Sequence, residues 1–195
     1  MGKTLREAAK DRILILDGAM GTMIQQYKLE EEDFRGYRYR KTPGMMKGNN
    51  DMLNITRPDV ITDIHRKYLR AGADIISTNT FSSQRISQAD YHLEESAREM
   101  ALLGVQLARK AADEFSTEEK PRFVAASVGP TNKTCSMSPD VSNPATRDIT
   151  YAQLYDAYLE QIAAFEEGGA DAILIETVVD TLNAKAAIAD TMEVE

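Results

Sequence analysis

The sequence predicts an α/β protein with a parallel sheet, because short apolar runs alternate with helical patterns along the chain. Residues 13–16, ILIL, precede Asp17, and four apolar residues in a row are typical of a strand buried on both faces. The phrase Gly-Ala-Asp followed by an apolar run occurs at residues 72–80 and again at residues 169–177. A third apolar run lies between them at residues 122–128. We therefore expect four strands, each opening a β/α unit.

The segments between these runs have the apolar spacing of helices. Pro58 suits the first turn of a helix, and apolar residues recur three and four positions apart after it. Residues 93–115 predict a long helix with a face of small residues, which suits close packing on a sheet. Thr150 and Gln153 have capping-box spacing, and residues 180–192 predict a fourth helix.

Two architectures fit four β/α units. One is an open, doubly wound sheet, and the other is the first half of a closed (β/α)₈ barrel, a fold of about 250 residues. The barrel interpretation implies that residues 1–195 hold only the first four units. The pattern leaves both architectures open. In either case residues 1–12 predict a short leading helix, and residues 24–56 predict an insertion after the first strand.

Composition limits the classes of function. The chain has 195 residues, of which 43% are hydrophobic, so it can bury one sizeable core. Its net charge of −8 argues against a nucleic-acid or anionic-membrane surface. A single cysteine excludes an internal disulfide and favours a reducing compartment. No apolar run approaches the ~20 residues of a membrane span, and the first residues do not resemble a signal peptide. We therefore expect a cytoplasmic protein without a nucleic-acid or membrane partner.

The candidate site lies at the carboxyl ends of the predicted strands, where both architectures bind their ligands. Those ends carry the backbone N–H groups around Gly18 and Ala19 and the side chains of Asp17, Asn79, Thr80, Thr131, Asn132, Glu176 and Asp180. Such a set suits a small zwitterion, because a carboxylate holds an ammonium and backbone N–H groups hold the acid end. Two alternatives remain. Asp17 and Glu176 could only anchor loops, or they could act as an acid and a base.

Other kinds of site are not supported. The chain has two histidines, His65 and His92, and one cysteine, Cys135, so it cannot supply the three or four N/S ligands of a zinc site. Cys135 has no histidine near it in sequence, and such a cysteine is more often inert than nucleophilic. Residues 129–134, GPTNKT, lack the spacing of a phosphate loop, and Pro130 removes an N–H donor.

Several motifs resemble the homocysteine S-methyltransferase family. They are LDGAMGTMIQ at residues 16–25, GNND at 48–51, ADII and TNTF within 73–81, GPTN at 129–132, and IET with DTLNAKAA within 175–187. Two more, DFRG at residues 33–36 and SPDV at residues 138–141, are similar to the cobalamin-dependent methionine synthases of this family. The resemblance extends from about residue 12 to residue 189, nearly the whole chain.

The resemblance implies a (β/α)₈ barrel, of which this chain would be the N-terminal half, and homocysteine as the substrate. In that family pattern Asp17 and Glu176 hold the amino group of homocysteine, and the N–H groups of Gly18 and Ala19 lie near its carboxylate. Asn79 and Thr80 then form part of the pocket wall.

The resemblance also implies cofactors that these residues do not hold. A zinc ion bound by three cysteines beyond residue 195 would lower the pKa of the substrate thiol. Cobalamin on another domain would carry the methyl group, with 5-methyltetrahydrofolate as its source, and methionine would be the product. The chain alone would then contain no catalytic residue and would be inactive. Betaine- or S-methylmethionine-dependent homocysteine methyltransferases are the second expectation, and a non-catalytic amino-acid-binding module is the third.

Overall fold

The sheet contains three parallel strands in chain order, in a computed structural model that describes residues 3–193. The strands are β1 (Ile75–Ser77), β2 (Phe123–Val128) and β3 (Ala172–Ile175). β1 pairs with β2 from Ile75 opposite Phe123, and β2 pairs with β3 from Ala125 opposite Ala172. The predicted α/β fold with a parallel sheet is therefore confirmed. The order of the described strands has no reversal of the kind that marks a doubly wound sheet.

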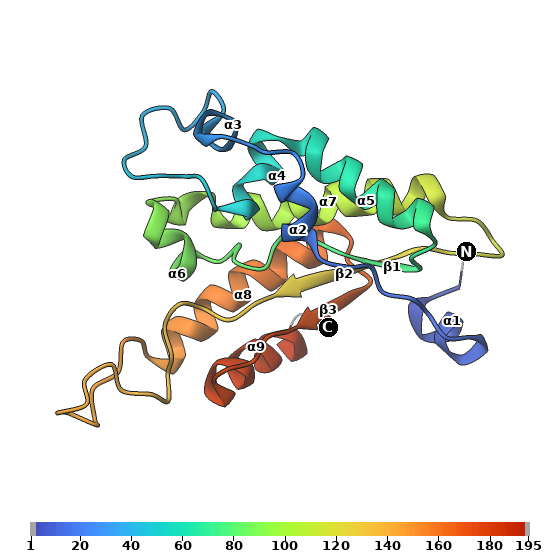
Figure 1. Ribbon diagram of the computed structural model, residues 1–195. Helices are drawn as coiled ribbons and strands as arrows, with labels where there is room; N and C mark the ends of the chain where they lie inside the picture. The colour runs from blue at the N-terminus through green and yellow to red at the C-terminus, as the bar shows by residue number, and fades with distance from the viewer. Residues whose placement is uncertain (1–2, 194–195) are drawn as a thin grey trace.

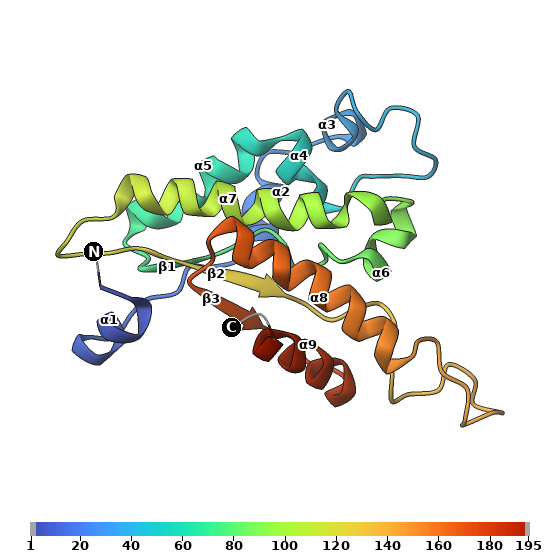
Figure 2. The ribbon, with the colours of Figure 1, turned by 180° about the vertical axis from the view of Figure 1, so that it is seen from behind.

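Helices cover one face of this sheet (Figures 1 and 2). The elements are α1 (Leu5–Asp11), α2 (Met20–Gln25), α3 (Glu31–Arg35), η1 (Asn50–Met52), α4 (Leu53–Thr56), α5 (Pro58–Ala71), α6 (Arg85–Gln88), η2 (Ala89–Tyr91), η3 (Glu94–Ser96), α7 (Ala97–Phe115), α8 (Tyr151–Gly168) and α9 (Thr181–Glu193). Helices α5, α7, α8 and α9 contact one another in chain order. Their apolar faces share one core with Ile76 of β1 and Val124 and Ala126 of β2. Within residues 3–193, no helix combines the length and apolar character needed to cross a bilayer.

Most predicted helix ends agree with the structure, but the helix expected from residue 93 begins at Ala97, after the short 3₁₀ turn η3. Helix α5 begins at Pro58, and the glycines of the repeated phrase, Gly72 and Gly169, end α5 and α8 with φ angles of 109° and 85°. This left-handed conformation is one that glycine adopts without steric cost. Thr150 accepts the N–H of Gln153 in the predicted capping box. Helix α1 lies within the expected leading helix, whose first two residues fall outside the described range.

The prediction for residues 13–16 is wrong in two respects. This segment forms only an isolated parallel bridge, between Leu16 and Ile75, instead of a full strand. It is also not buried on both faces, since Ile13 is 86% and Ile15 is 56% exposed. The segment pairs with β1 on one side, and no described strand lies on its other side. An apolar run shows that a segment suits burial, but burial also needs a neighbour on each side.

The aspartate of each repeated phrase joins the start of its strand to the segment that precedes it in the sheet. Asp74 is 1% exposed, and its carboxylate accepts a hydrogen bond from the N–H of Ile15 at 3.0 Å. It also accepts hydrogen bonds from Nη1 and Nη2 of Arg12 at 2.7 and 2.8 Å. The hydrogen bonds from Arg12 hold the pKa of Asp74 at about 2. In the second copy, Asp171 accepts the N–H of Val124 at 2.7 Å. The repeat is thus a structural device that sets strand register.

We expect Asp74→Asn to lower the free energy of unfolding by roughly 1.5–3 kcal/mol near neutral pH, because it removes hydrogen bonds from Arg12 to a charged group. Since the folded-state pKa is about 2, below the usual 3.8, this contribution is present above about pH 4 and is lost as the pH falls toward 2. Urea unfolding of both proteins at about pH 7 and about pH 3 measures the difference. Asp171→Asn tests the second copy of the phrase, with a smaller expected loss because the Asp171 side chain is 30% exposed. Asp156→Asn, at an exposed position of α8, is the control and should leave the free energy of unfolding nearly unchanged. A loss in Asp74→Asn that is the same at both pH values would contradict the assigned role.

Candidate functional site

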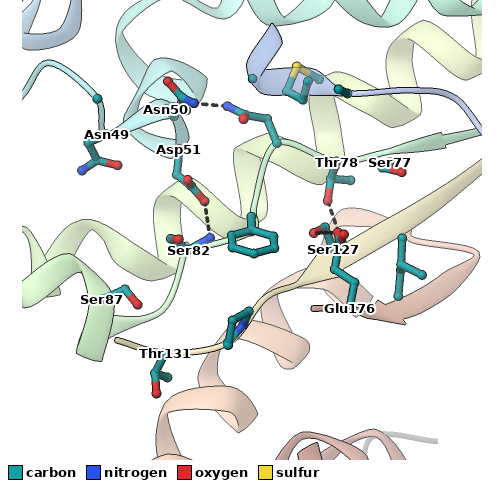
Figure 3. Close-up of a pocket in the computed structure, with 18 of the residues that line it drawn as sticks. Asn49, Asn50, Asp51, Ser77, Thr78, Ser82, Ser87, Ser127, Thr131 and Glu176 are labelled. Carbon is teal, nitrogen blue, oxygen red and sulfur yellow. Dashed lines mark hydrogen bonds between the residues drawn. The ribbon is translucent and has the colours of Figure 1, made fainter. Parts of the chain in front are cut away.

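A cleft of about 780 Å³ opens at the carboxyl ends of the strands (Figure 3). Its walls come from the turn after residue 16, residues 48–51 of the insertion, the loop after β1, the loop after β2 and the end of β3. The cleft brings together most of the predicted strand-end residues: Asp17, Gly18, Ala19, Asn79, Thr131, Asn132 and Glu176. Thr80 and Asp180 do not line it.

Four polar side chains form a row on the face of the sheet that is turned away from the helices. They are Asp17, Ser77 of β1, Ser127 of β2 and Glu176 after β3. Side chains alternate between the two faces of a strand, and the neighbour of Ser77, Ile76, lies in the helix-facing core. Ser77 donates its N–H and its Oγ to the Asp17 carboxylate, each at 2.9 Å. Ser127 Oγ donates to Glu176 Oε1 at 2.6 Å.

Burial makes Asp17 a weaker acid than usual. Its pKa is raised from 3.8 to about 6, chiefly by desolvation and to a smaller extent by the nearby Glu176, while the hydrogen bonds from Ser77 oppose the rise. Asp17 and Glu176 are therefore close enough to interact through charge. The residue after Glu176, Thr177, has a φ of 58°, which is strained for a β-branched side chain and turns the chain sharply at the cleft.

The cleft lining is acidic. Its described residues include four carboxyl groups, those of Asp17, Asp51, Asp90 and Glu176, and no lysine, arginine or histidine. Low-dielectric walls strengthen the field of such groups. This lining therefore attracts cationic groups and disfavours anions, except where backbone N–H groups are available to an acid.

Gly18 leaves room for the Tyr68 side chain beside the first loop. A Cβ atom built on Gly18 would lie 3.0 Å from Tyr68 Oη, closer than an ordinary contact. Tyr68 Oη in turn donates a hydrogen bond to the carbonyl oxygen of Ala19 at 3.0 Å. The glycine thus lets helix α5 support the turn that carries Asp17.

Asn79 and Thr80 are held by other protein groups. Asn79 Nδ2 donates to the Asn50 carbonyl at 2.8 Å and to Asn54 Oδ1 at 3.1 Å, so it ties the insertion to the end of β1. Thr80 is fully buried and donates its hydroxyl to the Ser127 carbonyl at 2.9 Å. The expectation that Asn79 and Thr80 form pocket wall thus agrees with the position of Asn79 and differs from that of Thr80.

Sequence reasoning did not select three residues of this site, namely Ser77, Ser127 and Asp51. Asp51 is 6% exposed and accepts the N–H of Ser82 and the hydroxyl of Ser83, both at 2.8 Å. Desolvation by burial raises its pKa to about 6. The two serines could have been identified from the sequence, because each is a polar residue within an apolar run that is expected to form a buried strand.

The described residues do not fit a zinc site. Cys135, the one cysteine, is buried outside the cleft and donates its N–H to Asn183 Oδ1 at 3.1 Å. His65 is fully buried in α5, where desolvation lowers its pKa to about 4. Among residues 3–193, no group of three or more His, Cys, Asp or Glu side chains is placed to hold a metal ion.

We expect Asp51→Asn to stabilise the protein near neutral pH. Asparagine keeps an acceptor for Ser82 and Ser83, and it removes a buried charge whose folded-state pKa of about 6 lies above the usual 3.8. The folded protein holds the Asp51 proton more tightly, so the cost of the charge is present above about pH 6 and fades as the pH falls toward 4. A shift of this size corresponds to roughly 2–3 kcal/mol. Urea unfolding at about pH 7 and about pH 4.5 measures it, and a gain that is independent of pH would refute this explanation.

Comparison with known proteins places the chain in a family. The family model for homocysteine S-methyltransferase matches residues 14–195. Three crystal structures of the homocysteine methyltransferase MmuM from Escherichia coli have a similar fold. The match to the metallated form has a TM-score of 0.73 and 20% identity, and it covers 97% of this chain and 62% of the matched chain. For the oxidized form the TM-score is 0.73 and the identity 22%, with 98% of this chain and 62% of the matched chain covered. For the apo form the TM-score is 0.65 and the identity 20%, with 97% and 59% covered in the same order. This chain thus spans about three fifths of those proteins. It belongs to the homocysteine S-methyltransferase family.

Proposed function

We propose that this chain is the homocysteine-binding part of a methyltransferase that converts homocysteine to methionine. The observation that carries the proposal is the pair of carboxylates, Asp17 and Glu176, in a cleft with no basic side chain among its described lining residues. An ammonium group between two carboxylates gains charge-assisted hydrogen bonds to both. Family membership supports homocysteine as the amino acid.

The remaining cleft residues suit the rest of this ligand. Gly18 and Ala19 line the cleft beside Asp17, and their backbone N–H groups are available donors for the carboxylate of an amino acid. Phe81, Pro130 and Leu174 supply apolar lining for the methylene chain that leads to the sulfur. The alternative that Asp17 and Glu176 only anchor loops explains the bonds to serine, but it does not explain why both carboxylates face one open cleft.

We further propose that the methyl donor is methylcobalamin, with 5-methyltetrahydrofolate as the ultimate source, as in the cobalamin-dependent methionine synthases. The support is the sequence of residues 33–36 and 138–141. Asp33 accepts the N–H of Glu30 at 2.9 Å and pairs with Arg57 at 2.7 Å, so the first motif shapes the insertion. Neither motif lies among the described lining residues of the cleft, so this support is independent of the amino-acid site.

The same resemblance supports a (β/α)₈ barrel that further sequence completes, in a cytoplasmic protein. Cobalamin and folate domains would be its partners. Activation of the substrate sulfur by zinc would need ligands that residues 3–193 do not offer, and no step through a metal is assigned to this chain. We therefore expect the 195 residues to bind homocysteine without turnover.

A second candidate is a homocysteine methyltransferase that uses betaine or S-methylmethionine. The acidic lining of the cleft favours it, because quaternary ammonium and sulfonium donors are cations and a negative field attracts them. A third candidate is an amino-acid-binding module without catalysis, which would bind homocysteine even when the rest of the family sequence is present but would never release methionine.

We expect Asp17→Asn and Glu176→Gln each to weaken homocysteine binding roughly 10–100-fold, the usual effect of losing a hydrogen bond to a charged group. Binding to the unaltered chain should also weaken as the pH falls through about 6, where Asp17 takes up a proton. Isothermal titration calorimetry on the 195-residue chain measures both effects.

Asp140→Asn, in the exposed loop after β2 and outside the cleft, is the matched control and should bind homocysteine normally. Unchanged affinity in both Asp17→Asn and Glu176→Gln would return these carboxylates to the role of loop anchors. It would also remove the basis of the proposed function.

The donor is tested with a longer protein that carries the remaining family sequence. We expect it to form methionine from homocysteine with methylcobalamin and not with betaine or S-methylmethionine. Turnover with either onium compound alone would support the second candidate. Binding without turnover with any donor would support the third.

A further inference from the structure

Asp17 and Glu176, two of the four carboxyl groups of the cleft, each receive a hydroxyl hydrogen bond from a serine on a neighbouring strand. Ser77 donates both its N–H and its Oγ to Asp17, and Ser127 donates its Oγ to Glu176. The serines lie on the neighbouring strands β1 and β2, with Asp17 hydrogen-bonded on the β1 side and Glu176 on the β3 side. Figure 3 shows Ser127 beside Glu176. Nothing in the proposed function requires serine at either position.

We propose that Ser77 and Ser127 are positioning residues for substrate recognition: each fixes one of the two carboxylates that receive the ammonium of homocysteine. This inference rests on the proposed function and deepens it. A carboxylate on one or more rotatable bonds can point in several directions, and only a fixed one is ready to bind without ordering cost. Ser77 uses one lone pair on each oxygen of Asp17, and the Ser127 hydroxyl uses one lone pair of Glu176, so each carboxylate keeps lone pairs for the ligand.

Packing alone does not explain these serines. Ser127 is 2% exposed in a strand whose other residues are phenylalanine, valine and alanine. Serine is not among the residues that favour strands, and a buried hydroxyl costs free energy unless it is hydrogen-bonded. Alanine would fill nearly the same space. The hydroxyl is therefore placed where it serves Glu176.

Ser77 has a second effect because Asp17 lies in an environment that favours its neutral form. The charged or titratable groups that act on Asp17 are Glu176, beyond the serines, and Tyr68 of α5, and neither is a cation. Burial raises the pKa of Asp17, and the two hydrogen bonds from Ser77 lower it. Removal of the hydroxyl leaves only the N–H bond, so Asp17 should take up its proton at a higher pH.

The experiment compares Ser77→Ala, Ser127→Ala and Ser77→Thr with the unaltered 195-residue chain. Two probes are used, L-homocysteine and 4-mercaptobutanoate, which has the same thiol and carboxylate but no amino group. Affinities are measured by calorimetry between about pH 5 and about pH 8. Thermal unfolding of each variant establishes that it is folded.

We expect each alanine variant to bind homocysteine about 10-fold more weakly at neutral pH, with 4-mercaptobutanoate affected less than 2-fold. In Ser77→Ala the fall in homocysteine affinity toward low pH should also move upward, by about half a pH unit or more. Ser77→Thr keeps the hydroxyl and should restore both values. A general loss of structure would instead weaken both probes together.

The outcomes separate the inference from the function on which it rests. One outcome is that the unaltered chain binds homocysteine and both alanine variants bind the two probes with unchanged affinity. The serines then have no positioning role, and the proposed function stands. Equal weakening of both probes also overturns the inference, because it shows a structural effect. If the unaltered chain does not prefer homocysteine over 4-mercaptobutanoate, the proposed function fails as well.

Discussion

The site depends on the register between residues 12–17 and β1, and a buried carboxylate sets that register. Asp74 accepts the N–H of Ile15 and the guanidinium of Arg12 at the beginning of the strand. Two residues after Ile15, Asp17 reaches the N–H and Oγ of Ser77. A slip of one residue would turn Asp17 to the other face of the sheet, because side chains alternate. The low pKa of Asp74 is the sign of this fixed contact, and Asp171 repeats the arrangement one strand further on.

Two buried carboxylates of the cleft lower the stability of the folded chain, as is typical of a binding site. Asp17 and Asp51 both have pKa values raised to about 6 by burial, so both carry charge at neutral pH in places that disfavour it. Structural carboxylates in the same chain, such as Asp74, are instead paired with arginine and have lowered pKa values. Unpaired buried acids next to an open cleft are typical of functional sites. A ligand that brings a positive charge would relieve the cost at Asp17.

Much of the fold could be predicted because local signals and the tertiary structure agree. The repeated glycine ends a helix with a positive φ, as its place before an apolar run indicates. The register contact of the aspartate after it is visible only in the structure. Burial could not be predicted in the same way. Residues 13–16 are apolar but exposed, since burial depends on neighbours that a single segment does not reveal. Thr80 shows the related limit for the site, because one step along a strand end decides whether a polar side chain faces the cleft or the core. Ser77 and Ser127 were missed because a serine in an apolar run suggests a weak strand unless its carboxylate partner is known.

The central claim is that Asp17 receives the ammonium of homocysteine. The most direct measurement is the pKa of the Asp17 carboxyl group. It is obtained from the ¹³C chemical shift of the carboxyl carbon as a function of pH, in the free chain and with homocysteine bound. The free value should lie near 6. Homocysteine should lower it by one unit or more, because a neighbouring cation favours the charged form. An Asp17 pKa that stays the same when homocysteine is bound would contradict the account.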